Sequence, residues 1–167
     1  MYKSAADTFG AALERLARAY EADPERRRDL LQEIHVAVWR SFAGFHGRCS
    51  LRTWVYRVAH NAATSYVLRQ RRVNTGTWLS LEEIEALPDG LDAERAAGRQ
   101  EMIERLLLLI QRLTPLDRKV ILSYLEGLDA ESIGDITGLS PGNVATKIHR
   151  IKSILASRFQ QGVRHGE

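Results

Sequence analysis

The chain has 167 residues, of which 44% are hydrophobic and 27% charged, with a formal net charge of +3. This composition is typical of globular proteins and excludes a wholly disordered chain. Its single cysteine, Cys49, excludes an internal disulfide framework and a CxxC metal site. The longest apolar run, residues 106–110, is too short to cross a bilayer, and residues 1–16 lack a signal-peptide core. A soluble cytoplasmic protein is therefore expected.

Three helices are expected in the first half, because apolar residues recur there at helical spacing. They are predicted at residues 9–20, 24–42 and 51–72. Pro24 separates the first two, and a glycine-rich loop, residues 44–50, separates the second from the third. On the third helix we expect Trp54 to face the core, and His60 and Thr64 to lie on the opposite, polar side.

Formal charge reverses along the chain. Residues 24–72 contain ten Arg and three acidic residues, a formal charge of +7. Residues 73–105 contain eight acidic residues and three Arg, a formal charge of −5. We interpret residues 73–98 as a flexible acidic linker, in which the capping-box pattern of Ser80 and Glu83 predicts a short helix. A polar surface loop is the alternative.

The second half is expected to be helical as well. Its strongly apolar segment, residues 100–113, is followed by Thr114 and Pro115, an N-cap and a first-turn proline that begin another helix. Gly127 ends that helix and Asp129 caps a short one, which a glycine-containing turn joins to a basic helix as a helix-turn-helix. The predicted fold is all-α, with two small helical domains joined by a linker. The predicted domains are residues 1–72 and 99–167, with residues 73–98 between them.

The last helix, residues 140–159, has two different stripes. The apolar stripe consists of Val144, Ile148, Ile151 and Leu155. At about 100° per residue, a second stripe consists of Asn143, Thr146, Lys147 and Arg150. Amide, hydroxyl and cationic side chains reach base edges and phosphates, and no acidic residue occurs between Asp135 and Glu167. The pattern indicates a DNA-recognition helix.

Two blocks of motifs resemble the extracytoplasmic-function (ECF) sigma factors, small bacterial promoter-specificity subunits of RNA polymerase. The block similar to region 2 of that family comprises residues 29–33, Trp39, residues 45–47 and residues 51–61. The block similar to region 4 comprises residues 113–118, 124–128 and 139–150. A helix-turn-helix alone is a weak signal, because many regulators carry one. Two blocks in the right order, joined by an acidic linker, are much more specific.

The resemblance implies a protein that binds core RNA polymerase, directs it to specific promoters and helps to melt the −10 element. Such a protein is not an enzyme, and the resemblance implies neither a cofactor nor a metal site. The implied partners are core RNA polymerase, promoter DNA and an anti-sigma factor, which in this family is often membrane-bound.

Site residues follow from the resemblance, residue by residue. Those expected to bind core polymerase are Asp29, Gln32, Glu33, Val36 and Trp39. Those expected to contact the −10 element are Phe45, His46, Tyr56, Arg57, Asn61 and Thr64. Those expected to contact the −35 element are Asn143, Thr146, Lys147, His149 and Arg150. Two positions depart from the family pattern: Ala145 replaces a common basic residue, and Gly134 replaces an alanine, which points to a closer or looser helix crossing.

Plainer alternatives exist for several of these residues. Residues 29–39 could be a solvated helix face, Phe45 could fill the core, and Lys147 could neutralise a phosphate rather than read a base. A redox role for Cys49 stays open, whereas a zinc site there lacks enough ligands. For the whole chain, the alternatives are a repressor or activator that never needs polymerase, and a protein-interaction module. The first of these leaves residues 29–39 and the aromatic loop unexplained.

Overall fold

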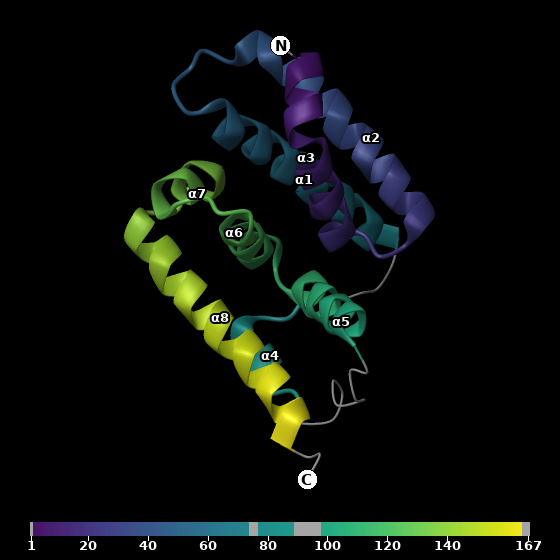
Figure 1. Cartoon of the computed structure of the whole chain (residues 1–167), viewed down its shortest axis with the longest axis vertical. Helices are drawn as coiled ribbons and strands as arrows, with labels where there is room; N and C mark the ends of the chain where they lie inside the picture. The colour runs from purple at the N-terminus through teal and green to yellow at the C-terminus, as the bar shows by residue number, and fades with distance from the viewer. Residues whose placement is uncertain (1, 74–76, 89–97, 165–167) are drawn as a thin grey trace.

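The computed structural model describes residues 2–73, 77–88 and 98–164, and it confirms the all-α prediction (Figure 1). Within these residues the only β-type pairing is an isolated bridge between Leu79 and Leu113. The helices are α1 Tyr2–Tyr20, α2 Pro24–Ser41, the 3-10 helix η1 Phe42–Gly44, α3 Leu51–Val73, α4 Leu81–Glu85, α5 Arg99–Arg112, α6 Pro115–Leu125, α7 Ala130–Thr137 and α8 Pro141–Arg164. No helix among the described residues is both long and apolar enough to span a membrane.

Helix starts follow the capping residues. At α2 the Asp23 carboxylate accepts hydrogen bonds from the backbone N–H groups of Glu25 and Arg26, at 3.0 and 2.9 Å. These bonds satisfy donors that a helix start would otherwise leave unpaired. The same kind of cap begins α4, α6 and α7, at Ser80, Thr114 and Asp129. Ser80 and Glu83 form the predicted capping box, so the short helix expected in the linker is confirmed.

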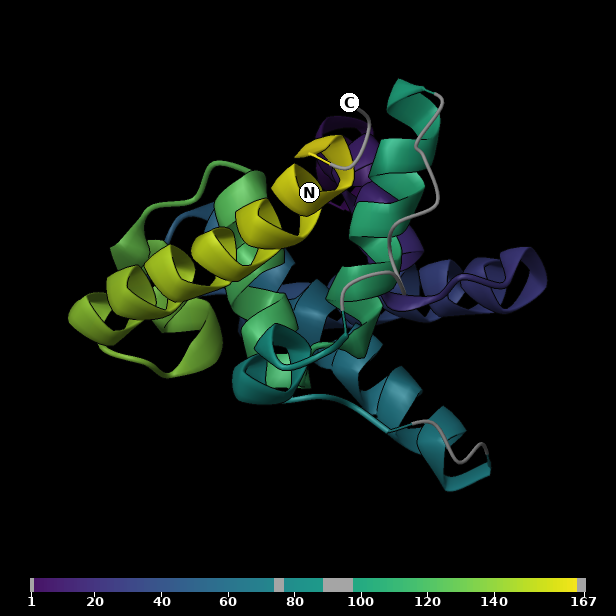
Figure 2. The same ribbon diagram turned by 90° about the horizontal axis from the view of Figure 1, so that it is seen from below.

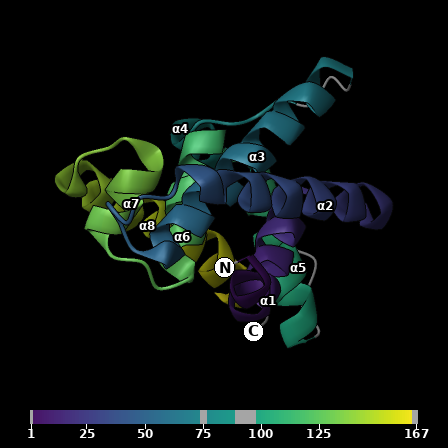
Figure 3. The ribbon, with the colours of Figure 1, turned by 90° about the horizontal axis from the view of Figure 1, so that it is seen from above.

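The first half, residues 2–73, packs α1 and α3 against α2 (Figure 3). Helix α1 begins at Tyr2 rather than at Phe9, so the predicted start was wrong. Its added turns are held by the burial of Ala5 and by a contact of 3.1 Å between the Tyr2 hydroxyl and Nδ1 of His35. These contacts lie outside the apolar periodicity, which is why the sequence pattern did not include them.

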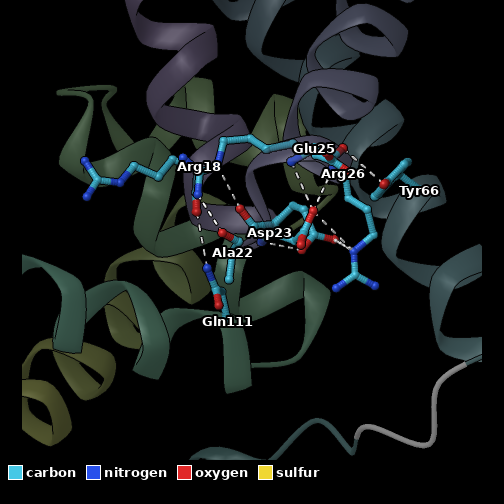
Figure 4. Close-up of polar contacts among 9 residues, drawn as sticks. Arg18, Ala22, Asp23, Glu25, Arg26, Tyr66 and Gln111 are labelled. Carbon is cyan, nitrogen blue, oxygen red and sulfur yellow. Dashed lines mark hydrogen bonds and ion pairs between the residues drawn. The ribbon is translucent and has the colours of Figure 1, made fainter.

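The corner between α1 and α2 is tied to two other helices (Figure 4). Tyr66 of α3 donates a hydrogen bond to the backbone carbonyl of Arg26, at 3.1 Å. Gln111 of α5 donates from Nε2 to the carbonyl of Arg18, at 3.2 Å. Main-chain acceptors at this corner therefore bind side chains from both halves of the chain.

In the second half, residues 98–164, α7 and α8 form the predicted helix-turn-helix. Helix α7 ends at Gly138, whose φ of 81° lies in the left-handed region that favours glycine. Gly134, one turn earlier, lies so close to the turn that an added Cβ would sit 2.7 Å from the carbonyl oxygen of Leu139. The close approach observed at Gly134 is therefore to the backbone of the turn after α7.

Replacing Gly134 with alanine is therefore expected to destabilise the chain by about 1–3 kcal/mol, because the clash is with backbone. Gly10 of α1 is a matched control, since nothing lies within 4 Å of an added Cβ there. Gly10→Ala should instead be neutral or stabilise by up to about 1 kcal/mol through helix propensity. Urea unfolding followed by circular dichroism measures both, and equal stability of Gly134→Ala and the unmodified chain would contradict the close approach.

Part of the predicted linker is packed on the second half rather than extended. Leu81 and Ile84 of α4 are 5% and 0% exposed, and α4 lies against α8 (Figure 1). The guanidinium of Arg71 lies 4.5 Å from the ring centroid of Trp78, which joins this segment to the end of α3. The other parts of the predicted linker, residues 74–76 and 89–97, fall outside the described residues.

The two halves pack closely together. Helix α3 lies along α6 and α7, and α1 lies along α5 (Figures 1 and 2). Buried apolar side chains form one continuous cluster through both halves. We call this packing of α1 and α3 against α5, α6 and α7 the closed arrangement. It determines which candidate site residues are accessible.

Candidate nucleic-acid interface

Helix α8 presents four of its five candidate DNA-contacting residues to solvent. Its apolar stripe faces inward, with Val144 and Ile151 fully buried, which turns the other side of the helix outward. The exposed candidates are Asn143, Thr146, His149 and Arg150. The hydroxyl of Ser140 caps the helix by accepting from the N–H of Asn143, at 3.2 Å. These four side chains form a hydrogen-bonding row on a helix without acidic residues, and we call them the α8 row.

Lys147, the fifth candidate, is not part of this row. Its ammonium lies 2.6 Å from the carboxylate of Asp117 on α6, and the two side chains are 28% and 7% exposed. Asp117 also accepts a hydrogen bond from Thr114, at 3.0 Å. Lys147 follows the buried Val144 by three residues, so it lies at the edge of the apolar side, facing α6. The structure therefore pairs Lys147 within the chain with Asp117, a residue of α6 that was not among the predicted site residues.

Arg150 of the α8 row has a partner from the linker. Its guanidinium lies 2.7 Å from a carboxylate oxygen of Glu82 on α4, with the two side chains 46% and 66% exposed. The pKa of Glu82 is lowered by its own backbone N–H and, after that, by the hydrogen bond from Arg150. Arg150 is therefore accessible to solvent, and its guanidinium is already bound to one carboxylate.

Two −10 candidates, Phe45 and Arg57, contact Trp54 at the start of α3, and a third lies in the adjacent loop. The half-buried ring of Phe45 has its centroid 5.4 Å from that of Trp54, and the guanidinium of Arg57 lies 4.7 Å from the Trp54 ring. His46 is exposed in the adjacent loop. Trp54 itself is held by a hydrogen bond from its indole N–H to the hydroxyl of Ser41, at 2.9 Å. Aromatic and cationic groups in a loop of this kind can stack on unpaired bases.

Of the other three −10 candidates, Tyr56 and Asn61 contact the second half, and Thr64 lies further along the same helix. Tyr56 is 2% exposed and donates its hydroxyl to the carboxylate of Glu126, at 3.0 Å. Burial, and next the negative charge of Glu126, raises the pKa of Tyr56 to about 12. Asn61 is exposed but accepts from Lys119 of α6 at 3.0 Å, and Thr64 is half-buried. Tyr56 is therefore covered in the closed arrangement, because α3 packs against helices of both halves.

His60 of α3 is also buried, contrary to its expected place on a polar face. Its Nδ1 lies 2.8 Å from the hydroxyl of Tyr20 on α1, and its Nε2 lies 3.2 Å from the hydroxyl of Ser123 on α6. Burial, followed by the nearby charge of Lys119, lowers the pKa of His60 to about 3. His60 is therefore held neutral where three helices from both halves meet.

Glu126, just after α6, is the main polar contact between the halves. Its carboxylate accepts two hydrogen bonds from Arg15 of α1, at 2.7 and 2.9 Å, besides the one from Tyr56. Its backbone carbonyl accepts from Arg52 of α3. The hydrogen bonds from Arg15 lower the pKa of Glu126 despite its partial burial. Beside this cluster, a cavity of about 390 Å³ with mostly apolar walls lies between the halves.

All five candidates for polymerase binding lie on the exposed side of α2. They are Asp29, Gln32, Glu33, Val36 and Trp39. Val36 is 45% and Trp39 60% exposed, which is unusual for large apolar side chains. Glu33 pairs with Arg69 of α3. Apolar and acidic groups on one helix face are typical of a protein-binding surface, and this face stays open in the closed arrangement.

Metal chemistry finds no support in the described part of the chain, since no group of three or more His, Cys, Asp and Glu residues there could hold an ion. The arrangement instead offers two separated exposed surfaces and one occluded one. The exposed surfaces are the α8 row and the α2 face, and the occluded surface is the side of α3 that carries Tyr56.

Two protein-family models match the chain in separate blocks. Sigma-70 region 2 matches residues 6–73, and Sigma-70, region 4 matches residues 103–155. The first block contains the α2 face and the −10 candidates, and the second contains the helix-turn-helix. The gap between the blocks covers the predicted linker.

Curated relatives match over most of their length. An ECF RNA polymerase sigma-E factor of Haemophilus influenzae is 28% identical over 139 residues, which cover 79% of this chain and 74% of that protein. The ECF RNA polymerase sigma factor SigX of Bacillus subtilis is 26% identical over 162 residues, which cover 92% and 81%.

Solved structures match both halves together. The sigma factor RpoE in complex with the anti-sigma factor NepR from Bartonella quintana has a TM-score of 0.69 at 17% identity, covering 95% of this chain and 96% of that one. CnrH in complex with the cytosolic domain of CnrY has a TM-score of 0.64 at 18% identity, covering 95% and 87%. At these identities the likeness shows the fold.

Proposed function

Because the chain belongs to the ECF sigma factors of RNA polymerase, we propose that its two halves divide the work of promoter recognition. The protein is a transcription initiation factor that acts with the polymerase and directs it to promoters. In this proposal the first half binds core polymerase and opens the −10 element, and the second half reads the −35 element.

The α8 row carries the proposal for the −35 element. Amide, hydroxyl, imidazole and guanidinium groups project from one side of a helix that begins directly after a tight turn. Such a helix fits the major groove, where Arg makes bidentate contacts to guanine and Asn to adenine. We assign base or phosphate contacts to Asn143, Thr146, His149 and Arg150, and a positioning role to Lys147 through Asp117.

The first half has two tasks in this proposal. The α2 face docks on core polymerase through Val36 and Trp39, with Asp29, Gln32 and Glu33 around them. Phe45, His46 and Arg57 meet a base of the separated −10 strand, since the aromatic ring, the imidazole and the guanidinium offer planar surfaces for stacking.

Opening of the closed arrangement is a necessary part of this mechanism. Tyr56 and Asn61 are candidate −10 contacts, yet Tyr56 is buried against Glu126, and Asn61 is hydrogen-bonded to Lys119 of α6. The α2 face is exposed, so polymerase can dock before the halves separate. Binding then shifts the population toward the open form, because only that form offers all of its contact surfaces.

Regulation by an anti-sigma factor fits the same two-state scheme. The two solved structures named above are complexes with NepR and CnrY, and both match this chain across its two halves. A partner that binds only the closed arrangement would hold the protein inactive. We place the protein in the cytoplasm, where its polymerase acts, and assign it no catalytic step of its own.

Transcription tests the proposal directly. Purified chain plus core polymerase should give run-off transcripts from promoters mapped by sequencing the transcripts that rise on overexpression. Arg150→Ala should weaken binding to these promoter duplexes by about 5- to 160-fold while polymerase binding is unchanged, since a base contact of Arg contributes about 1–3 kcal/mol.

Lys152→Ala is the matched control for this experiment. Lys152 lies on the same helix, but its ammonium contacts the hydroxyl of Tyr124 at 3.1 Å, away from the α8 row. Its loss should weaken DNA binding only slightly and equally for all sequences. Failure to bind core polymerase would leave the rival hypothesis, a DNA-binding regulator that never needs polymerase.

A further inference from the structure

Helix α4 is held firmly beside the α8 row. Leu81 and Ile84 are almost completely buried, so the helix docks through two aliphatic side chains. Arg158 of α8 donates hydrogen bonds to the backbone carbonyls of Ile84 and Leu87, the second at 2.7 Å. The N–H of Leu79, just before α4, donates to the carbonyl of Arg112 at 2.7 Å.

The internal structure of α4 is fixed as well. Ser80 accepts from the N–H of Glu83 at 3.2 Å, and the Glu83 carboxylate accepts from the N–H of Ser80 at 2.7 Å. A closed capping box defines where the first turn begins and which way its side chains point. The backbone position of Glu82 beside Arg150 is therefore set by the helix and its anchors, independently of the ion pair.

The contact between Glu82 and Arg150 resembles a DNA contact in its chemistry. A carboxylate offers two acceptor oxygens to a guanidinium, as do a phosphate group and the O6 and N7 atoms of guanine. The 2.7 Å separation is that of a charge-assisted hydrogen bond. Both side chains remain partly exposed, so DNA could replace Glu82 without unfolding α4.

We propose that α4 is a built-in competitor of DNA, which holds the Glu82 carboxylate where Arg150 would otherwise meet a phosphate or a guanine. The free chain then binds duplex DNA more weakly than its reading helix alone would. This inference rests on the proposed function, because it requires that Arg150 contact DNA. An acceptor that binds Arg150 better than Glu82 does, such as a guanine in the correct register, displaces it, whereas a poorer one does not.

Binding of the free, full-length chain to a labelled promoter duplex, followed by fluorescence anisotropy at low ionic strength, tests the inference. Glu82→Gln should tighten binding by about 2- to 5-fold, the range that exposed ion pairs supply. Glu85→Gln is the control, because Glu85 lies exposed on the same helix and makes no ion pair with the described part of the chain. It removes the same charge, so any gain it gives measures general electrostatics alone.

Arg150→Ala distinguishes failure of the competition from failure of the DNA contact of Arg150. In that background the additional gain from Glu82→Gln should disappear, because there is no guanidinium left to release. Glu82→Gln and Glu85→Gln could tighten DNA binding equally, while Arg150→Ala still weakens it. That result would overturn the competition and leave the proposed function intact. An Arg150→Ala chain that binds the duplex as tightly as the unmodified one would overturn the DNA role of Arg150, and the competition with it.

Discussion

Replacing Trp39 with alanine is expected to weaken binding to core RNA polymerase by about 30-fold or more, since a central Trp in an interface typically contributes at least 2 kcal/mol. Trp39 is 60% exposed at the end of α2, beside Val36 at 45%. An exposed indole next to a second apolar side chain is a surface that a partner would bury. Affinity for core polymerase, measured by biolayer interferometry, checks the prediction.

Leu68→Ala is the matched control for this change. Leu68 is 45% exposed on α3, in the same half but outside the α2 face. Neither variant should change the thermal unfolding of the free chain much, because both side chains lie outside the core. If the two variants lost affinity equally, or if Trp39→Ala bound normally, the α2 face would be only a solvated helix surface.

Acid is expected to open the closed arrangement, with a rise of about tenfold in the ratio of open to closed molecules between pH 7.5 and 5.5. The pKa of His60 is lowered to about 3 in the closed arrangement, so His60 stays neutral there. Once exposed, its pKa returns to about 6.5, and it gains a proton below that pH. The open form therefore binds more protons. The contribution of His60 to the stability of the closed arrangement is complete above pH 6.5. It decreases as the pH falls from 6.5 toward 3.

Groups around His60 do not offset this effect. Tyr20 of α1 and Tyr56 of α3 stay neutral throughout this range, because burial raises the pKa of each. Lys119 of α6 stays positive and opposes a proton on His60. Glu126 has a lowered pKa, so its contribution to closure is lost only as the pH falls through the ordinary pKa of a glutamate and below it. The change in the ratio of open to closed molecules between pH 7.5 and 5.5 is therefore due to His60.

Energy transfer between dyes on the two halves measures this opening. Cys49 is the only cysteine of the chain, and the exposed Ser153 of α8 can be replaced with a second one. His60→Gln keeps a donor and an acceptor for Tyr20 and Ser123 but does not titrate, so its energy transfer should not change over this range. The same pH response in both proteins would show that another group controls opening, and far-UV circular dichroism distinguishes opening from unfolding.

Local structure was predictable because it depends on neighbours in the sequence. Caps at Ser80, Thr114 and Asp129 each act within three residues, and each begins a helix as predicted. The apolar stripe of α8 likewise correctly identified Val144 and Ile151 as buried. The position of Lys147 next to this stripe likewise fits its contact with Asp117 of α6.

Contacts between the halves could not be predicted in this way. The partners of Glu126 on α1 and α3 are 111 and 70 residues away along the chain. Nothing in the local pattern of α3 indicates that a second layer of helices covers the side with His60. A polar side chain on the less apolar face of a helix looks exposed until a neighbour with matching hydrogen-bonding groups, here Ser123, is placed against it.

The docking of α4 also sets how far apart the halves can move. While Leu79 stays bound to the carbonyl of Arg112, only the chain from Val73 to Leu79 joins the two halves. At about 3.4 Å per residue, this tether reaches at most about 20 Å. With α4 released, the tether runs from Val73 to Arg99 and reaches about 90 Å.

The longer tether is long enough for the two halves to make the proposed contacts to both promoter elements at once. Elements centred near −35 and −10 lie about 85 Å apart along B-form DNA, at about 3.4 Å per base pair. Undocking of the five-residue helix thus adds about 70 Å to the length of the tether. This increase is most of the distance between the two promoter elements. While α4 is docked, this short helix therefore limits how far apart the two halves of the chain can be.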